Sequence, residues 1–272
     1  MKPFVAAAVL AAPALIGAQQ QTSNPRSGWP CGARLDASYF QVAEGTGGHV
    51  LLLAPEEIAD SATLLTAIGS HPQTILRVAG SLRPGVHEFQ VPIDPSVESV
   101  IFSISSQCLE VAHVTLPSGL PATGGNVTDL SNFRAQRMVI VARPEPGIWT
   151  MRVSGSGVSG VMVQARSAIG ISQLRFTTSG STTPSALPTA GVENVVTMKV
   201  TGKFGEARAA LVSAEFLKIA DLPLERGDAE ETYLSRFTPG AEGFRVLITG
   251  KDAEGVPFQR LHAPLLTPAV SR

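Results

Sequence analysis

The chain lacks the features that mark several large protein classes. Its 272 residues carry a formal net charge of −1, and no segment is rich in Lys or Arg. That balance argues against electrostatic binding to nucleic acid or to a membrane surface. Aromatic residues make up only 6% of the chain, so stacking platforms for sugars or bases are poorly supplied. No apolar run reaches the ~20 residues of a membrane-spanning helix, so we expect no membrane insertion.

Enzyme motifs are missing as well. The sequence contains no Gly-x-Ser-x-Gly elbow, no His-Glu-x-x-His, no phosphate-binding Gly-x-x-x-x-Gly-Lys and no Cys-x-x-Cys. The histidines occur singly, at His49, His71, His87, His113 and His262. We therefore expect no enzyme, and we assign no catalytic, cofactor-binding or metal-binding residue and no cofactor. A secreted hydrolase with a triad built from distant residues stays an alternative.

Cysteine is scarce, with only Cys31 and Cys108 present. In an exported chain an even count permits one disulfide, and we favour that bridge over two separate buried thiols. A sequon begins at Asn126, in a run rich in Gly and Pro, and it would be glycosylated in a eukaryotic secretory pathway.

The N-terminus has the pattern of an export signal. Lys2 precedes an apolar run from Phe4 to Ile16, and the small residues Gly17 and Ala18 follow. We predict a signal peptide at residues 1–18, cut near Ala18, and hence a secreted protein, periplasmic if the source is bacterial.

After residue 70, short apolar runs alternate with Gly and Pro, which is typical of all-β proteins. In residues 147–155, for example, Trp149, Met151 and Val153 share the face opposite to Ile148, and we expect Trp149 to anchor the core. In the strand at 256–264 we expect Phe258 in the core and Gln259 and Arg260 outward. The predicted strands lie at 74–80, 87–93, 99–105, 109–116, 138–143, 147–155, 159–167, 172–178, 194–202, 209–219, 232–237, 243–252 and 256–264. They predict a β-sandwich at 73–178, a linker at 179–191 and a second, immunoglobulin-like sandwich at 192–268.

One segment departs from the β pattern. Residues 55–72 repeat apolar side chains at helical spacing, with Pro55 suited to the first turn and Gly69 to the end, which predicts one amphipathic helix. The predicted fold is therefore mainly β, with two immunoglobulin-like or jelly-roll-like sandwiches and a short N-terminal α/β part at 19–72.

The run YFQVAEGTGGHVLLLAPEEI, residues 39–58, resembles the end of a von Willebrand factor A domain, where a helix, a Thr-Gly-Gly turn, the last strand and a closing helix follow in order. Downstream, FQVPIDPSVESVIFSIS, PEPGIWTMRVSGSG and FRVLITGKDAEGVPFQR resemble, in the same order, the region that follows the A domain in hemicentins and related extracellular proteins. The resemblance covers roughly residues 36–268 and implies an A-domain remnant followed by β-rich modules.

An A domain binds a divalent cation through an Asp-x-Ser-x-Ser loop, and this chain has no such loop. Three Asp-x-Ser tripeptides each lack the second hydroxyl, and we expect turns or helix caps there; they begin at Asp36, Asp94 and Asp129. The segment 250–255 alternates carboxylates with glycine, but two carboxylates are too few for calcium, so we expect a charged hairpin loop.

The resemblance and the missing motifs together predict a secreted, non-enzymatic protein of extracellular adhesion, assembly or ligand binding, with a protein or a glycan as partner. A carbohydrate-binding sandwich is the main alternative, since jelly-roll sandwiches often act as lectins. An A-domain remnant also leaves a sheet edge, which is either covered or used to form a homo-oligomer.

Overall fold

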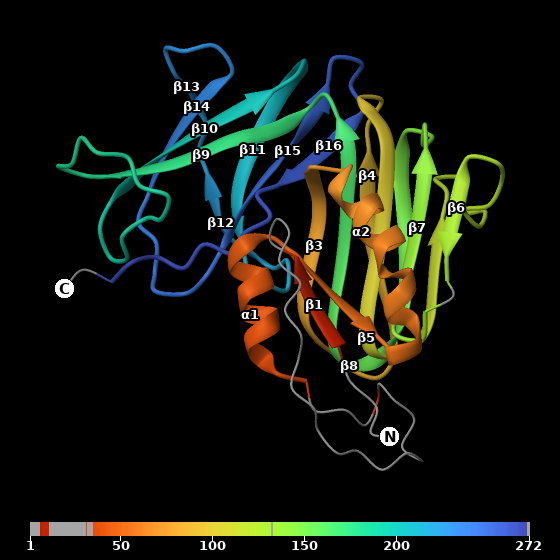
Figure 1. Cartoon of the computed structure of the whole chain (residues 1–272). Coiled ribbons are helices and arrows are strands. Elements are labelled where there is room, and N and C mark those ends of the chain that lie inside the picture. The colour runs from red at the N-terminus through yellow and green to blue at the C-terminus, as the bar shows by residue number, and fades with distance from the viewer. Residues whose placement is uncertain (1–5, 11–30, 32–34, 132, 271–272) are drawn as a thin grey trace.

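The computed structural model describes residues 6–10, 31, 35–131 and 133–270. Strands dominate it, and helices are confined to the N-terminal part (Figure 1), so the prediction of a mainly β fold is confirmed. The helices are α1 (Ala37–Thr46), the 3-10 helix η1 (Pro55–Asp60) and α2 (Ser61–Gly69). The strands are β1 (Ala6–Leu10), β2 (His49–Leu53), β3 (Gln73–Leu82), β4 (Val86–Ile93), β5 (Val97–Thr115), β6 (Val127–Leu130), β7 (Gln136–Ala142), β8 (Gly147–Ser167), β9 (Gly170–Thr178), β10 (Asn194–Thr201), β11 (Phe204–Val212), β12 (Lys218–Leu222), β13 (Glu225–Arg226), β14 (Thr232–Phe237), β15 (Arg245–Asp252) and β16 (Pro257–Leu261).

Strands β3 to β8 form the first sandwich around the longest strands of the chain. β5 and β8 pair along most of their length, and β8 pairs with β4 through its first half and with β3 through its second half. The sheet thereby bends over on itself and encloses one apolar core. Trp149 is fully buried there, stacked on Phe102 with ring centroids 5.4 Å apart. Its predicted place as a core anchor is confirmed, and Met151 and Val153 share its buried face.

The bend explains why two pairs of predicted strands are single strands. The sequence analysis ends a strand at Gly155 and starts another at 159, as if a turn intervened, but β8 continues through both. A Cβ at Gly155 would collide with the carbonyl oxygen of Cys108 on the neighbouring strand β5. Glycine here permits the close approach of two strands and does not reverse the chain.

The remaining strands form a second core. The four-stranded sheet β13-β14-β10-β9 packs against β11, β12, β15 and β16, and side chains such as Met198, Val246 and Phe258 fill the space between them. β9, which the sequence analysis groups with the first sandwich, pairs with β10 and contributes Phe176 to this second core. The structure thus places the change of core between β8 and β9, whereas the predicted linker 179–191 follows β9.

Several contacts join the cores. β16 meets β3 at the pair Leu261–Thr74, which makes one ten-stranded sheet across both groups. Arg260 of β16 reaches the first group, where its Nη2 lies 2.7 Å from Asp94 Oδ2 and both side chains are fully buried. The sequence analysis places Gln259 and Arg260 outward, and this is wrong: the amide of Gln259 donates to the backbone carbonyl of Ile75 at 2.8 Å.

The N-terminal part covers one face of the first sandwich (Figure 1). Leu51, Leu53 and Leu64, from β2 and α2, pack against Ile101 and Met138 of the underlying sheet. The helix predicted at 55–72 is present but shorter, since the chain from residue 55 begins as η1 before it becomes α2; α1, which the A-domain resemblance implies, precedes β2.

A side-chain contact accounts for the tight first turn of η1. The Glu57 carboxylate accepts from the backbone N–H of Ala54 at 2.6 Å and from that of Arg134 at 2.8 Å. Both bonds hold the turn against the sandwich. The order helix, strand, helix is the one that the A-domain resemblance implies, although the A-domain origin itself stays a prediction.

Strand β1 lies inside the predicted signal peptide. It pairs antiparallel with β2, from Ala6–Leu53 to Leu10–His49. The predicted cleavage near Ala18 lies outside the described residues, and removal of the peptide stays a prediction. Cleavage would take away the only strand that pairs with β2 in the described part of the chain.

Candidate functional site

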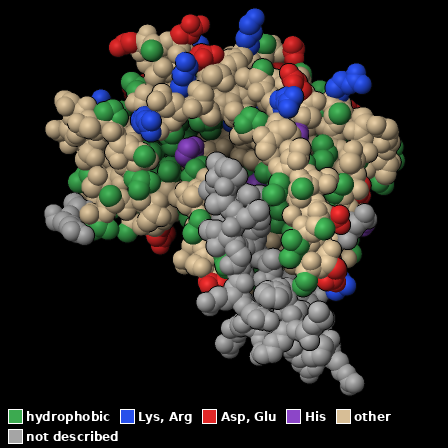
Figure 2. Space-filling view, in the orientation of Figure 1, with side chains coloured by type: hydrophobic (Ala, Val, Ile, Leu, Met, Phe, Trp, Pro, Cys, Tyr) green, Lys and Arg blue, Asp and Glu red, His purple; other side chains and the backbone are tan. Residues whose placement is uncertain are grey.

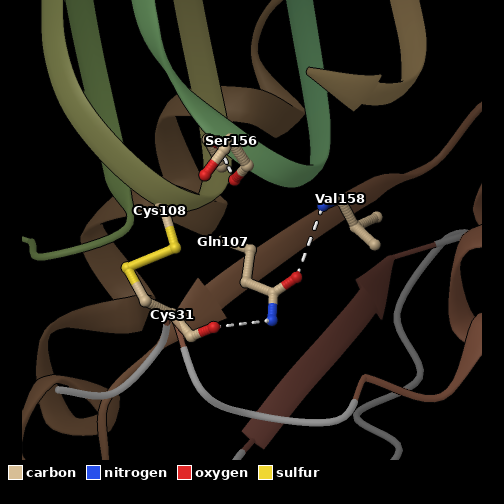
Figure 3. The surroundings of a disulfide bond; sticks show 6 residues. Cys31, Gln107, Cys108, Ser156 and Val158 are labelled. Carbon is tan, nitrogen blue, oxygen red and sulfur yellow. Dashed lines mark hydrogen bonds between the residues drawn. A yellow bond between two sulfur atoms is a disulfide. The ribbon is translucent and has the colours of Figure 1, made fainter. Parts of the chain in front are cut away.

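The disulfide predicted from the cysteine count is confirmed. Cys31 and Cys108 are bonded, with Cα atoms 4.8 Å apart and a separation of 77 positions in the sequence. The bridge ties the segment before α1 to β5 (Figure 3), and Gln107 donates to the carbonyl of Cys31 at 3.4 Å. The bond closes a loop that contains α1, β2, η1 and α2, so it ties these elements to the first sandwich.

The three Asp-x-Ser tripeptides lie apart and have structural roles. Asp36 caps α1 by accepting from the N–H of Ser38 at 2.9 Å. Asp94 accepts from the N–H of Ser96 at 3.1 Å and pairs with Arg260, while Asp129 forms an ion pair with Arg137. Within the described ranges, no three His, Cys, Asp or Glu side chains are grouped so that they could hold a metal ion.

Two other sequence features lie where they were expected. The β15–β16 connection is a hairpin in which Gly255 has a φ of 85°, and the Asp252 carboxylate binds the N–H groups of Glu254 and Val256. Asn126 is exposed in the turn before β6, a strand that sequence analysis missed, and its side chain donates to the Ala142 carbonyl at 3.0 Å. Glycosylation of Asn126 stays a prediction.

A small cavity lies beneath α1 and β2, and it brings a histidine near three serines. His49 lines it with Ser103, Ser105 and Ser159, but His49 Nε2 donates to Gln164 Oε1 at 2.6 Å and not to a serine. Burial lowers the pKa of His49 to about 4. The cavity measures about 40 Å³, which is room for water and not for a substrate. The buried Ser105 hydroxyl has no protein partner, so it suits such a water.

His71, by contrast, contacts serines directly. Its Nε2 lies 2.8 Å from the Ser99 hydroxyl, while Nδ1 faces the carbonyl of Ala67 and the hydroxyl of Ser70 at the end of α2. No carboxylate orients the ring among the contacts of these described residues. The histidine therefore attaches the end of α2 to β5 and lacks the third member of a hydrolytic triad.

A much larger space opens where the three parts of the chain meet. We call it the junction groove; its volume is about 590 Å³ and its walls are mostly apolar. It is lined by Phe40, Gln41, Glu44, Gly45, Ala79, Gly80, Ser81, Val158, Ala214, Glu215, Leu265 and Thr267. Its size falls in the range of ordinary ligand sites. Sequence analysis missed it because its walls come from α1, β3, β8, the β11–β12 turn and the C-terminal segment.

A buried charge cluster holds this groove open. Glu44 of α1 bonds through one oxygen to Arg77 of β3, 2.7 Å from Nη2, and through the other to Arg245 of β15. Arg245 also donates to the carbonyls of Ala263 and Ala214, at 3.0 and 3.2 Å. Burial lowers the pKa of Arg245, and the Glu44 carboxylate opposes that shift. One carboxylate thus fixes the three walls relative to one another.

Exposed apolar side chains follow the turn that lines one wall of the groove. The β11–β12 turn, residues 213–217, interrupts the strand predicted at 209–219, and its Phe216 adopts a φ of 65° while packing on the first core. Beyond it, Leu217 and Ile219 are 67% and 52% exposed, and β12 is the terminal strand of its sheet. Exposed apolar residues on a sheet edge are typical of sites for another chain.

Comparison with known proteins identifies the first sandwich. Residues 74–168 match the family described as hemicentin galactose-binding domain-like. Hemicentin-1 of Mus musculus is 25% identical over 239 residues, and Hemicentin-1 of Homo sapiens 25% over 241, each alignment covering 82% of this chain. Hemicentin-2 of Mus musculus is 26% identical over 252 residues, or 85% of this chain. The chain spans only 4–5% of the length of these relatives.

A solved structure of the lipase BlEst2 from Bacillus licheniformis, in its propeptide form, aligns at 11% identity with a TM-score of 0.34, covering 70% of this chain and 40% of that one. That likeness is too weak to carry an argument. No helix in the described ranges is both long and apolar enough to cross a membrane. The resemblance inferred from sequence is confirmed: the chain is hemicentin-like over most of its length, with a match to the hemicentin galactose-binding-like domain at residues 74–168.

Proposed function

We propose that the chain is a secreted, non-enzymatic adhesion protein whose junction groove binds an extended segment of an extracellular partner protein. The observation that carries this proposal is the mostly apolar groove of about 590 Å³, one wall of which is the β11–β12 turn that leads into the edge strand β12. An extended peptide gains main-chain hydrogen bonds from a free strand edge and specificity from a neighbouring apolar pocket.

The likeness to hemicentins supports an extracellular location and a ligand-binding role. The confirmed disulfide supports an oxidising compartment as well. The buried ion pairs support a groove that is formed before the ligand arrives, which lowers the entropic cost of binding.

Filling the groove tests the proposal. Gly45 lines it, and a Cβ added there meets no atom within 4 Å, so Gly45→Phe places a ring in the groove without disturbing α1. Gly69→Phe is the matched control, because Gly69 ends α2, has equal free space and lies outside the groove. The purified secreted protein is used to select binders from a displayed library of random peptides, and the selected peptides are then titrated against both variants.

We expect selected peptides that bind the wild type and Gly69→Phe equally and lose binding to Gly45→Phe. Peptides that bind Gly45→Phe as well as they bind the wild type would place recognition elsewhere and overturn the groove. A robust hydrolase activity of the purified protein that disappears on a point change would overturn the non-enzymatic part.

A further inference from the structure

A second groove lies at the far end of the second core, outside residues 74–168, which match the hemicentin galactose-binding-like domain. We call it the end groove; its volume is about 650 Å³, and apolar and polar atoms share its walls. It is built from the β10–β11 turn, the β13–β14 turn and the start of the β15–β16 turn. In the space-filling view, acidic and basic side chains gather along the upper edge of the molecule, at the end where β13 and β14 lie (Figures 1 and 2).

Two aromatic rings form the apolar wall. Phe204 and Tyr233 have centroids 5.9 Å apart, and Phe204 in turn packs on the buried Phe258 at 5.5 Å. Both wall residues are half-buried, and Tyr233 is held in β14 between Met198 of β10 and Arg226 of β13. The rings are therefore fixed in place while part of each remains open to the groove. A fixed aromatic face is the surface on which the C–H groups of a pyranose ring stack, since those hydrogens meet the negative face of the ring.

Polar groups without ion-pair partners line the same groove. Lys203, Arg226, Asp228 and Glu230 are exposed, and none of these four makes an ion pair within the described residues. They present both donors and acceptors, which is what the hydroxyl groups of a sugar require. Glu231, the remaining wall carboxylate of that turn, adopts a φ of 59° and accepts from the N–H of Gly202 at 3.2 Å.

The sign of the charge decides between sugar classes. Four carboxylates line the groove against two cations, so an anionic ligand would meet a surplus of negative charge. Sulfated and sialylated glycans are thereby disfavoured. Asp252, one of the four, already accepts two backbone N–H groups, so the carboxylates do not converge on a cation either.

We propose that the end groove binds a neutral glycan, with a pyranose ring stacked on Tyr233 and its hydroxyls bonded to Asp228 and Arg226. This site differs from the junction groove in place and in ligand class, so it does not depend on the protein-binding proposal.

The test uses a glycan microarray that carries neutral, sialylated and sulfated glycans, probed with the fluorescently labelled full-length secreted protein. A hit is then titrated by calorimetry at low and high salt. We expect binding to neutral glycans that is insensitive to salt, because no charge is neutralised. Asp228→Ala weakens it about tenfold, as expected for hydrogen bonds to a charged group. Tyr233→Ala weakens it about fivefold through lost stacking.

Control variants show whether a loss of glycan binding comes from the end groove or from a general effect of substitution on the protein. Asp228 is exposed, so its variant tests the proposal even if Tyr233→Ala fails to fold. Arg236→Ala is the matched control for Arg226→Ala, because Arg236 is an exposed arginine of β14 outside the groove. Gly45→Phe leaves glycan binding unchanged, which distinguishes this result from failure of the junction groove.

Three results would overturn the proposal. They are an array with no bound glycan, binding restricted to anionic glycans and lost at high salt, and neutral-glycan binding that survives Asp228→Ala and Arg226→Ala undiminished.

Discussion

Asp94→Asn should destabilise the protein strongly, because it breaks the buried ion pair between the two cores. Asp94 and Arg260 are both fully buried, with 2.7 Å between Oδ2 and Nη2. Burial lowers the pKa of Arg260 and the Asp94 carboxylate opposes that shift, so the guanidinium loses its compensating charge in the variant. Removing one member of a buried pair costs about 3–5 kcal/mol, since the other charge stays in a medium that solvates it poorly.

An exposed pair in the same fold is the matched control. Glu88 and Arg152 lie on neighbouring strands with 2.9 Å between Oε2 and Nε, and their side chains are 43% and 61% exposed. Glu88→Gln makes the same chemical change in water, where such a pair contributes only about 0–1 kcal/mol. The difference between the two variants in their loss of unfolding free energy therefore measures the effect of burial.

The assay is urea unfolding at pH 7, followed by fluorescence of the buried Trp149. We expect the midpoint of Asp94→Asn to fall while the slope with denaturant stays unchanged, so that the shift reports the free energy of unfolding. A double-mutant cycle with Arg260→Gln isolates the coupling between the two side chains. A cost for Asp94→Asn within about 1 kcal/mol of that for Glu88→Gln would refute the reasoning.

The other predictions concern the bridge, the strand crossing and one histidine. Replacing Cys108 by Ser should lower the free energy of unfolding by about 2–5 kcal/mol in urea, since the bridge closes a loop of 77 positions; equal stability of oxidised and reduced protein would contradict this. Gly155→Ala should cost about 1–3 kcal/mol through its collision with β5, whereas Gly160→Ala, in the same strand with open space, should cost far less; thermal melting compares them. The pKa of His49 is about 4 in the fold and about 6.5 in the unfolded chain, so the unfolded state takes up the proton first and stability falls from pH 6.5 to 4, by up to about 3 kcal/mol. His49→Gln should remove that part of the slope and the exposed His113→Gln should keep it; identical slopes in all three proteins would refute the assignment.

Oligomeric state tests the remaining prediction about the N-terminal part. Light scattering on the secreted chain and on the variant Leu51→Lys would show whether the edge of β2 joins copies of the chain into an oligomer. Leu51 packs on the first sandwich, so the variant needs a folding check by circular dichroism. A monomeric wild type would contradict the homo-oligomer prediction.

Local patterns predicted much of what lies within a single element. Alternation placed Trp149 inside and Ile148 outside, because successive side chains of a strand point to opposite faces. The hairpin at Gly255 and the helix cap at Asp36 were predictable for the same reason, since each depends on residues a few positions apart. The disulfide followed from a count of two.

Other features were decided by contacts between distant segments. The pattern around Gly155 predicts a turn, because the residues next to it do not reveal how close the neighbouring strand β5 lies. Arg260 was placed outward because its partner Asp94 lies 166 positions away. No sequence pattern pointed to a role for Glu44, although it bonds arginines from two other parts of the chain.

The sequence by itself therefore determined the fold class, the strand faces, the cysteine pair and the likeness to hemicentins, since periodicity, composition and ordered motifs are all written along the chain. Only the tertiary structure decided that the two cores share one sheet and that the junction and end grooves exist. A groove is the space left between elements, and its walls are chosen by packing and buried charge pairs that no short stretch of residues encodes.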